Sequence, residues 1–185
     1  IVDVETRAVL AERRVGEIEI RGPSVMAGYW RDPEKTAETI GPDGWMKTGD
    51  LGYLADERVF ICGRAKDVII VNGKNYYPQD LEWIAGDVDG IRAGNAIAFA
   101  ASKAGLDREA VVVVAETREP EEKRAALGNA IRQEVQRVLG LMPDEVVVAD
   151  VGTILKTSSG KLQRSKTRAA YEAGSLRARQ DEGKV

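Results

Sequence analysis

An unbroken apolar segment, AVVVVAET at residues 110–117, is the feature that most constrains the fold of this chain. A continuously apolar run of this length is typical of a β-strand that is buried on both faces. Because both faces of such a strand must be covered, the segment predicts a layered domain with a sheet in its interior.

Alternating strand and helix patterns surround this segment. Further strands are predicted at 67–73, 95–102 and 144–150, and helices at 78–88 and 165–174, the last closed by a glycine. The stretch 119–140 predicts the strongest helix, with acidic residues in its first turn and an apolar stripe formed by Leu127, Ile131, Val135, Val138 and Leu139. The alternation predicts a small α+β or α/β layer domain of about 120 residues.

The chain changes character near residue 64. Before that point, short apolar stretches are separated by Gly and Pro, and the alternation at 17–20 predicts a half-buried strand. Asp32 as N-cap and Pro33 at the first helical position predict a short helix. We expect small antiparallel strands here, with too little apolar content for an independent core, and therefore a piece of a larger domain.

The composition excludes several classes of mechanism. The 185 residues include 27 basic and 30 acidic side chains, and a net charge of −3 gives no general attraction to nucleic acid or to an anionic membrane. The chain has no histidine, which excludes a Ser-His-Asp triad and a His-rich metal site. Its single cysteine, Cys62, excludes an internal disulfide and a Cys-rich metal site, and we expect it to be a buried small hydrophobe. No apolar run approaches the ~20 residues that span a bilayer, and the first residues lack a secretory pattern, so a cytoplasmic location is expected.

The segment TILKTSSGKLQRSKTR, at 153–168, combines hydroxyls, a glycine and the ammonium group of Lys161, all of which suit phosphate oxygens. It is not a Walker A loop, because Leu155 and Leu162 occupy the positions where that loop needs a glycine and a Ser or Thr. An exposed basic loop is the alternative. WMKTGDLG, at 45–52, similarly places Asp50 in a Thr-Gly-Asp turn, where its carboxylate either forms the turn or is presented to sugar hydroxyls.

Taken in order, GEIEIRGPSVMAGYW, the TGD turn, GRAKD, the glycine loop before PQDLE and finally KTSSGK resemble the adenylate-forming superfamily of acyl-CoA synthetases, peptide-synthetase adenylation domains and luciferases. GRAKDVIIVNGKNYYPQDLE is most similar to the fatty-acyl-AMP ligases, although Lys74 replaces an arginine and Tyr76 a histidine of their usual pattern. In the closing KTSSGKLQRSKTRAAYEAG, Gln163 replaces another arginine.

The resemblance implies a domain organisation with a hinge. Residues 1–65 would be the last β-rich subdomain of a large N-terminal adenylation domain, and 66–185 the small mobile C-terminal domain, a mixed sheet flanked by helices. Lys66 would lie at the hinge about which this domain turns between two half-reactions.

The resemblance also implies binding roles. Lys161 matches the catalytic lysine that contacts the substrate carboxylate and the α-phosphate during adenylation. Asp50 and Arg64 match residues that bind the ribose of ATP or AMP. The thiol-tunnel loop of the second half-reaction would consist of Gly73, Lys74 and Asn75.

The resemblance implies ATP and Mg²⁺ as cofactors, bound mainly by an N-terminal domain whose phosphate loop and acyl tunnel this sequence does not contain. We therefore expect the chain alone to be inactive, and we expect no metal site of its own. The expected partners are that domain, a fatty acid, and either an acyl carrier protein or CoA as acceptor.

Three functions remain open at this point. They are part of a fatty-acyl-AMP ligase, part of an acyl-CoA synthetase or another adenylating enzyme, and a stand-alone binding module. The module would use the basic cluster Lys156, Lys161, Arg164, Lys166 and Arg168 to hold a carrier protein or a nucleic acid backbone.

Overall fold

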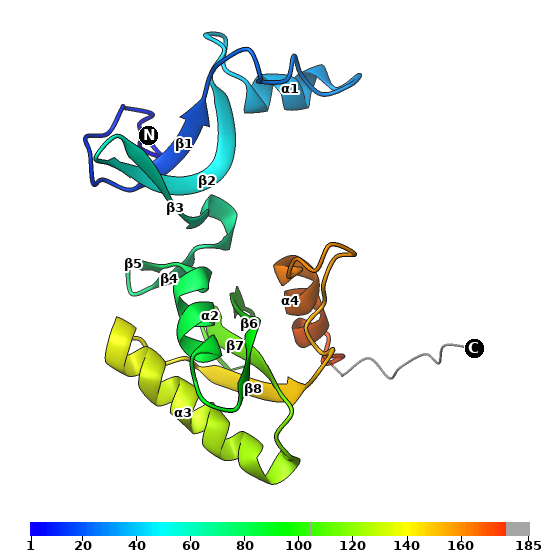
Figure 1. Ribbon diagram of the computed structural model, residues 1–185. Coiled ribbons are helices and arrows are strands. Elements are labelled where there is room, and N and C mark those ends of the chain that lie inside the picture. Colours follow the sequence, from blue (N-terminus) through cyan, green and yellow to red (C-terminus); the bar gives the residue numbers. More distant parts are fainter. Residues whose placement is uncertain (104, 177–185) are drawn as a thin grey trace. The chain divides into compact units, whose positions relative to one another are not determined.

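The computed structural model describes residues 1–103 and 105–176 (Figure 1). Its internal contacts divide the chain into two compact units, Ile1–Lys66 and a second unit that begins at Asp67. A short 3-10 turn, Ala65–Asp67, lies at this division. The role of Lys66 as a hinge stays a prediction.

The first unit is built on an antiparallel sheet of three strands, β1 (Gly16–Ile20), β2 (Met46–Ala55) and β3 (Arg58–Arg64), in that order. The predicted helix is present as α1 (Pro33–Thr39). The Asp32 carboxylate accepts a hydrogen bond of 2.9 Å from the backbone N–H of Lys35, as an N-cap should.

Few apolar side chains are buried in the first unit, which confirms the expectation of a thin core. They are Val2, Leu51 and Ala55. Large apolar side chains lie exposed instead, with exposed fractions of 86% for Trp30 and 72% for Ile61. Cys62 is only half-buried, contrary to the expectation of a buried thiol, because its strand has little core to face.

The second unit is built on a mixed sheet with the order β6 (Ile91–Ala101), β7 (Ala110–Thr117) and β8 (Glu145–Asp150). β6 and β7 are antiparallel, whereas β7 and β8 are parallel. The central β7 is the continuously apolar segment of the sequence, and all eight of its residues are buried, as predicted.

As far as the structure describes it, the second unit also contains a small hairpin and three helices. The hairpin pairs β4 (Ile69–Val71) with β5 (Lys74–Tyr76). The helices are α2 (Pro78–Gly86), α3 (Glu121–Leu139) and α4 (Arg164–Glu172).

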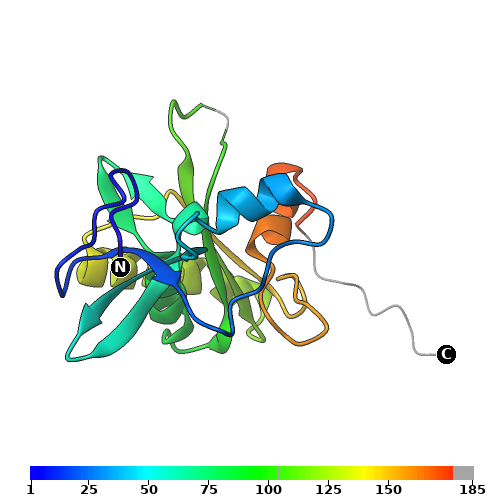
Figure 2. The same cartoon turned by 90° about the horizontal axis from the view of Figure 1, so that it is seen from above.

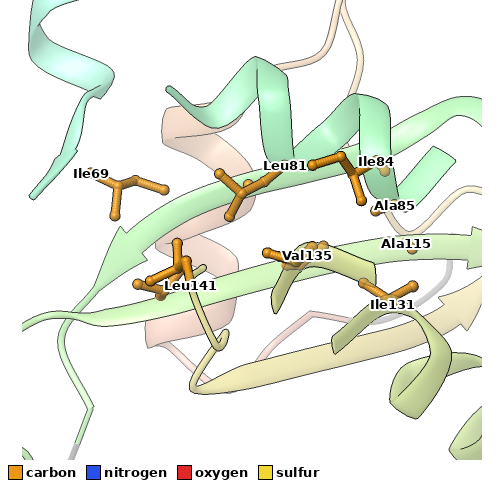
Figure 3. Packing of buried hydrophobic residues seen from close by; sticks show 12 residues of the cluster. Ile69, Leu81, Ile84, Ala85, Ala115, Ile131, Val135 and Leu141 are labelled. Carbon is orange, nitrogen blue, oxygen red and sulfur yellow. The ribbon is translucent and has the colours of Figure 1, made fainter. Parts of the chain in front are cut away.

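Alternate residues of β6 and β7 point to opposite faces of the sheet and build two apolar clusters. One cluster joins side chains such as Ala115 to the helices α2 and α3 (Figure 3). The other joins Val112 and Phe99 to Ile154 and to Tyr171 of α4. Figures 1 and 2 show α3 and α4 on opposite sides of the sheet.

The apolar stripe predicted for α3 is present over most of the helix. Ile131 and Val135 are fully buried against the sheet, and Leu127 and Leu139 are partly buried. Val138 departs from the prediction, because 46% of it is exposed near the last turn. The helix ends at Gly140, whose φ of 68° is the left-handed conformation that favours glycine after a helix.

Candidate functional site

Asp50 lies in a bulge within β2, not in the tight turn that the Thr-Gly-Asp sequence predicts. The strand pairing shifts register beside it, and Gly49 adopts a φ of 72°. The Asp50 N–H donates to Thr48 Oγ1 (3.0 Å), and that hydroxyl donates to the carbonyl of Ile18 (2.7 Å). The turn chemistry is therefore satisfied inside a continuous strand, and the carboxylate is free to point elsewhere.

That carboxylate faces Arg64. The two residues are paired across β2 and β3, and the distance from Arg64 Nε to Asp50 Oδ1 is 3.0 Å. The side chains are 55% and 33% exposed, respectively, so both remain accessible from solvent. The fold thus brings together the two residues predicted to bind ribose, although their role stays a prediction.

A buried carboxylate supports the bulge from behind. Glu17 Oε1 accepts from the Gly49 N–H (3.3 Å), and Glu17 Oε2 pairs with Arg7 Nη1 (2.5 Å). The other guanidinium nitrogen of Arg7 binds Glu19. Because Glu17 is only 9% exposed, this hydrogen bond fixes the backbone next to Asp50 in a place with little access to water.

Lys161 lies in a short hairpin that projects from the second unit. Lys156 and Leu162 form an antiparallel bridge, and between them the Lys161 N–H donates to Thr157 Oγ1 (3.0 Å). Gly160 has a φ of 82°, which explains the glycine of TSSGK. The hydroxyls of Thr157 and Ser159 bond each other (2.9 Å), so part of the predicted phosphate-binding chemistry instead shapes the loop.

The ammonium group of Lys161 is exposed, and within the described residues it has no hydrogen-bond or ion-pair partner. Other members of the predicted basic cluster are engaged, except Lys166 on α4, which is exposed and has no side-chain partner in the described part of the chain. Lys156 Nζ donates to Asn95 Oδ1, and Arg168 pairs with Glu109 (2.7 Å) and Glu172 (3.0 Å). Lys161 is therefore the cation of this loop that is available to a ligand.

Arg164 is also engaged, at the centre of a partly buried ion-pair network. Its Nη1 lies 2.7 Å from Asp67 Oδ2, and its Nη2 lies 2.6 Å from Glu82 Oε1. Arg164 Nε donates to the carbonyl of Ala98 in β6 (2.9 Å). The N–H of Ala98 donates to Glu82 Oε1 (3.0 Å). These three charged residues lie in separate motifs of the sequence, and nothing in those motifs indicates that they meet.

The three residues predicted for the thiol-tunnel loop lie at the tip of the β4–β5 hairpin. Gly73 follows Asn72, and both have positive φ values (74° and 51°), as in the two-residue turns that Asn-Gly favours. Asn75 is exposed and pairs with Ile70 across the hairpin. Lys74 Nζ lies 4.8 Å from the centre of the Tyr76 ring, which positions its ammonium group over that ring.

A second buried carboxylate, Glu116, lies beneath the Lys161 hairpin. Glu116 Oε2 pairs with Arg92 Nη1 (2.6 Å), which also donates to Asn95 Oδ1 (3.3 Å). These side chains, together with residues 151, 152 and 154–157, line a cavity of about 270 Å³. The sequence carried one signal of this site, a lone carboxylate within the apolar segment of β7.

Tyr171 fastens α4 to the sheet. Its hydroxyl donates to Glu145 Oε2 (2.8 Å), and the same carboxylate pairs with Lys103. Burial, reinforced by the hydrogen bond to this carboxylate, raises the pKa of Tyr171 to about 12.

Residues 1–103 and 105–176, which the structure describes, contain neither a membrane-spanning helix nor a cluster of metal ligands. No helix in this part of the chain is long and apolar enough to cross a bilayer. No group of three or more carboxylates and thiols lies close enough together to hold a metal ion there.

Comparisons with known proteins agree over most of the chain. The family model described as "Disco-interacting protein 2-like, AMP domain" matches residues 66–181. A Caulobacter vibrioides protein provisionally named acyl-CoA synthetase is 44% identical over 167 residues, which are 90% of this chain and 29% of that protein. The medium-chain-fatty-acid–[acyl-carrier-protein] ligase JamA of Moorena producens is 39% identical over 88% of this chain and 29% of its own length.

A solved structure shares the fold. ATP-bound MatB from Rhodopseudomonas palustris superposes with a TM-score of 0.81 at 29% identity, covering 95% of this chain and 34% of that one. The match to MatB includes residues from both units of this chain. The chain spans less than a third of the length of each of the two curated relatives.

Proposed function

Because the chain belongs to the AMP-domain family of adenylate-forming ligases, we propose that it works within an enzyme that activates a fatty acid with ATP. The first half-reaction would join the acid to AMP and release pyrophosphate. The second would pass the acyl group to the phosphopantetheine thiol of an acyl carrier protein. A relative that is named as an acyl-carrier-protein ligase supports this acceptor.

The observation that carries the proposal is the state of Lys161. Its ammonium group is exposed on a tightly hydrogen-bonded hairpin and has no partner within the described residues. A compact ammonium on a rigid loop suits charge that develops on the α-phosphoryl oxygens during adenylation. The neighbouring basic residues Arg164 and Arg168 are already neutralised by carboxylates, so they do not compete for this role.

Asp50 and Arg64 would bind the ribose of the nucleotide. A carboxylate is an acceptor-only group that receives hydrogen bonds from both ribose hydroxyls, and its pairing with Arg64 fixes its orientation. ATP would bring Mg²⁺ with it, and the ion would be held mainly by the N-terminal domain of the complete enzyme. Relatives with bound ATP support the nucleotide part of this proposal.

The domain that begins near Lys66 would turn between the half-reactions. Lys161 and the Gly73 loop lie on different elements of the same unit, so a rigid rotation of that unit could present one and withdraw the other. Lys66→Pro, which fixes φ at the proposed hinge, should impair thiol transfer more than adenylation.

The test uses the intact enzyme and measures each half-reaction separately. Lys161→Ala should slow adenylation, followed by ATP–pyrophosphate exchange, by ~10²–10³-fold, the size expected for one preorganised charge partner. Acyl transfer from supplied acyl-adenylate should continue. Lys166→Ala is the matched control, because Lys166 is also an exposed lysine nearby on α4. Equal loss of both half-reactions in Lys161→Ala would contradict the assignment.

An acyl-CoA synthetase is the second candidate, and the provisional name of the Caulobacter relative favours it. The intact enzyme should be offered CoA and a phosphopantetheinylated carrier protein in parallel. Efficient formation of acyl-CoA would replace the carrier-protein proposal with this one. The 185-residue chain alone should show no pyrophosphate exchange in either case.

A further inference from the structure

Glu116 is buried where a charge is costly. It is 1% exposed and lies near the end of β7, a strand whose eight residues are all buried. An ionised carboxylate in such a place must be paired and hydrogen-bonded, because leaving it without partners would cost several kcal/mol. What it binds is therefore informative.

The carboxylate clamps the segment that follows β8. Glu116 Oε1 accepts from the backbone N–H groups of Gly152 and Ile154, both at 2.9 Å. Glu116 Oε2 is held by Arg92 Nη1 at 2.6 Å. The chain thus returns from β8 across the end of β7 and is fixed there by a single charged side chain.

The clamped segment leads directly into the hairpin of Lys161. Ile154 is buried in the apolar cluster on the α4 face. The next residue, Leu155, donates its N–H to Thr167 Oγ1 (3.4 Å), and its carbonyl accepts from the Gln163 N–H (2.8 Å). The base of the hairpin is therefore attached to the sheet by Glu116 and to α4 by Thr167.

We propose that Glu116, oriented by Arg92, is a positioning residue that fixes the Lys161 hairpin for adenylation; this inference rests on the function proposed above. Glu116 itself does not touch the reacting groups. Its effect comes from holding the base of the loop, because a displacement of a catalytic group by about 1 Å can cost ~10²-fold in rate. It should act on adenylation, which needs Lys161, and not on thiol transfer.

The first test compares two variants of the intact enzyme. Glu116→Gln keeps an oxygen that can accept both N–H groups but turns an amide donor toward Arg92, so adenylation should fall by ~10-fold. Glu116→Ala removes the clamp, and adenylation should fall by ~100-fold. In both variants, acyl transfer from supplied acyl-adenylate should stay within about twofold of the parent.

Glu145→Gln is the matched control. Glu145 is also a paired carboxylate of this sheet, but its partners are Lys103 and Tyr171 and not the segment before the Lys161 hairpin. Adenylation by this variant should stay within about threefold of the parent enzyme. Parallel loss of both half-reactions in the Glu116 variants would mean general damage to the fold and would overturn the proposal.

The second test asks whether Glu116 acts through Lys161. In a Lys161→Ala background, Glu116→Gln should cause no further loss of adenylation, because there is no catalytic ammonium left to position. Multiplicative losses would overturn the proposal. An unchanged rate in Glu116→Ala, beside a large loss in Lys161→Ala, would overturn the positioning role alone.

Hydrogen exchange in the 185-residue chain tests whether Glu116 holds the segment before the hairpin, independently of any effect on adenylation. The amides of Gly152 and Ile154 should exchange at least ~10-fold faster in Glu116→Ala, whereas that of Val113 in β7 should not change. Unchanged exchange at these two amides would overturn the clamp, whatever the kinetics. If Lys161→Ala leaves adenylation unchanged, the proposed function fails and the positioning role fails with it, even where exchange confirms the clamp.

Discussion

Both units place a buried glutamate beneath a residue predicted to contact substrate. In the first unit, Glu17 accepts from Gly49 next to Asp50 and pairs with Arg7. In the second, Glu116 accepts from Gly152 and Ile154 on the approach to Lys161. In each case an arginine pairs with the glutamate, so the glutamate accepts backbone hydrogen bonds without being an unpaired buried charge.

The two units differ in what surrounds these clamps. The second unit has an apolar cluster on each face of its sheet, whereas the first buries only Val2, Leu51 and Ala55 among its apolar side chains. Precise placement of a side chain does not require a core of its own, since local hydrogen bonds can provide it. Independent stability does require one.

Separating the units should give the largest effect. A fragment of residues 67–185 should unfold cooperatively in urea, because it keeps both clusters. A fragment of residues 1–66 should show no cooperative transition, since so little apolar area is buried in it. Circular dichroism across a urea titration measures both, and a cooperative transition in the shorter fragment would contradict the comparison.

Introducing a carboxylate at one site in each unit tests the same contrast within the whole chain. Val113→Asp places a charge in the fully buried β7 and should destabilise the second unit by at least about 4 kcal/mol. Ile61→Asp, at a residue that is 72% exposed, should change stability by no more than about 0.5 kcal/mol. Hydrogen exchange resolved by unit reports both, and comparable losses would mean that Ile61 is structurally more important than its exposure indicates.

Arginine truncation compares the ion-pair networks. Arg164→Ala leaves Asp67 and Glu82 with little access to water and no counter-charge, and should cost about 3–5 kcal/mol. Arg7→Ala should cost only about 1–2 kcal/mol, because Arg7 is 35% exposed and water can replace it more easily. Equal losses in urea denaturation would show that burial does not decide the strength of these pairs.

Tyr171→Phe should give the smallest effect, a loss of about 1 kcal/mol at neutral pH from the missing hydrogen bond to Glu145. The pKa of Tyr171 is raised to about 12 in the folded chain, so above its ordinary value near 10 the unfolded chain loses the proton first. The parent should therefore lose stability as the pH rises from about 10 to about 12. In Tyr171→Phe the loss of stability that comes from this pKa shift should be absent. The free energy of unfolding, measured by urea denaturation at pH 9 and 11, should therefore fall more in the parent than in the variant.

Apart from β5, the order of elements in the second unit could be predicted from its sequence, because β7 and α3 carry strong local patterns. The bulge at Asp50 could not, since Gly49 signals a positive φ but does not say whether the strand continues beyond it. The network at Arg164 could not be predicted either. It joins Arg164 to Glu82 and Asp67, which precede it by 82 and 97 positions in the chain, and no local sequence pattern indicates contacts over such separations.

The arrangement around Ala98 also affects how the folded chain behaves among its own copies. Within residues 1–103 and 105–176, β6 neighbours only β7 in the sheet, and an uncovered outer strand offers free N–H and C=O groups on which another chain can add a strand. At Ala98 both groups are already bound, the carbonyl by Arg164 and the N–H by Glu82. The two side chains occupy the place where a foreign strand would pair with Ala98, so the same ion pairs that stabilise the second unit also block strand addition at this point of the edge.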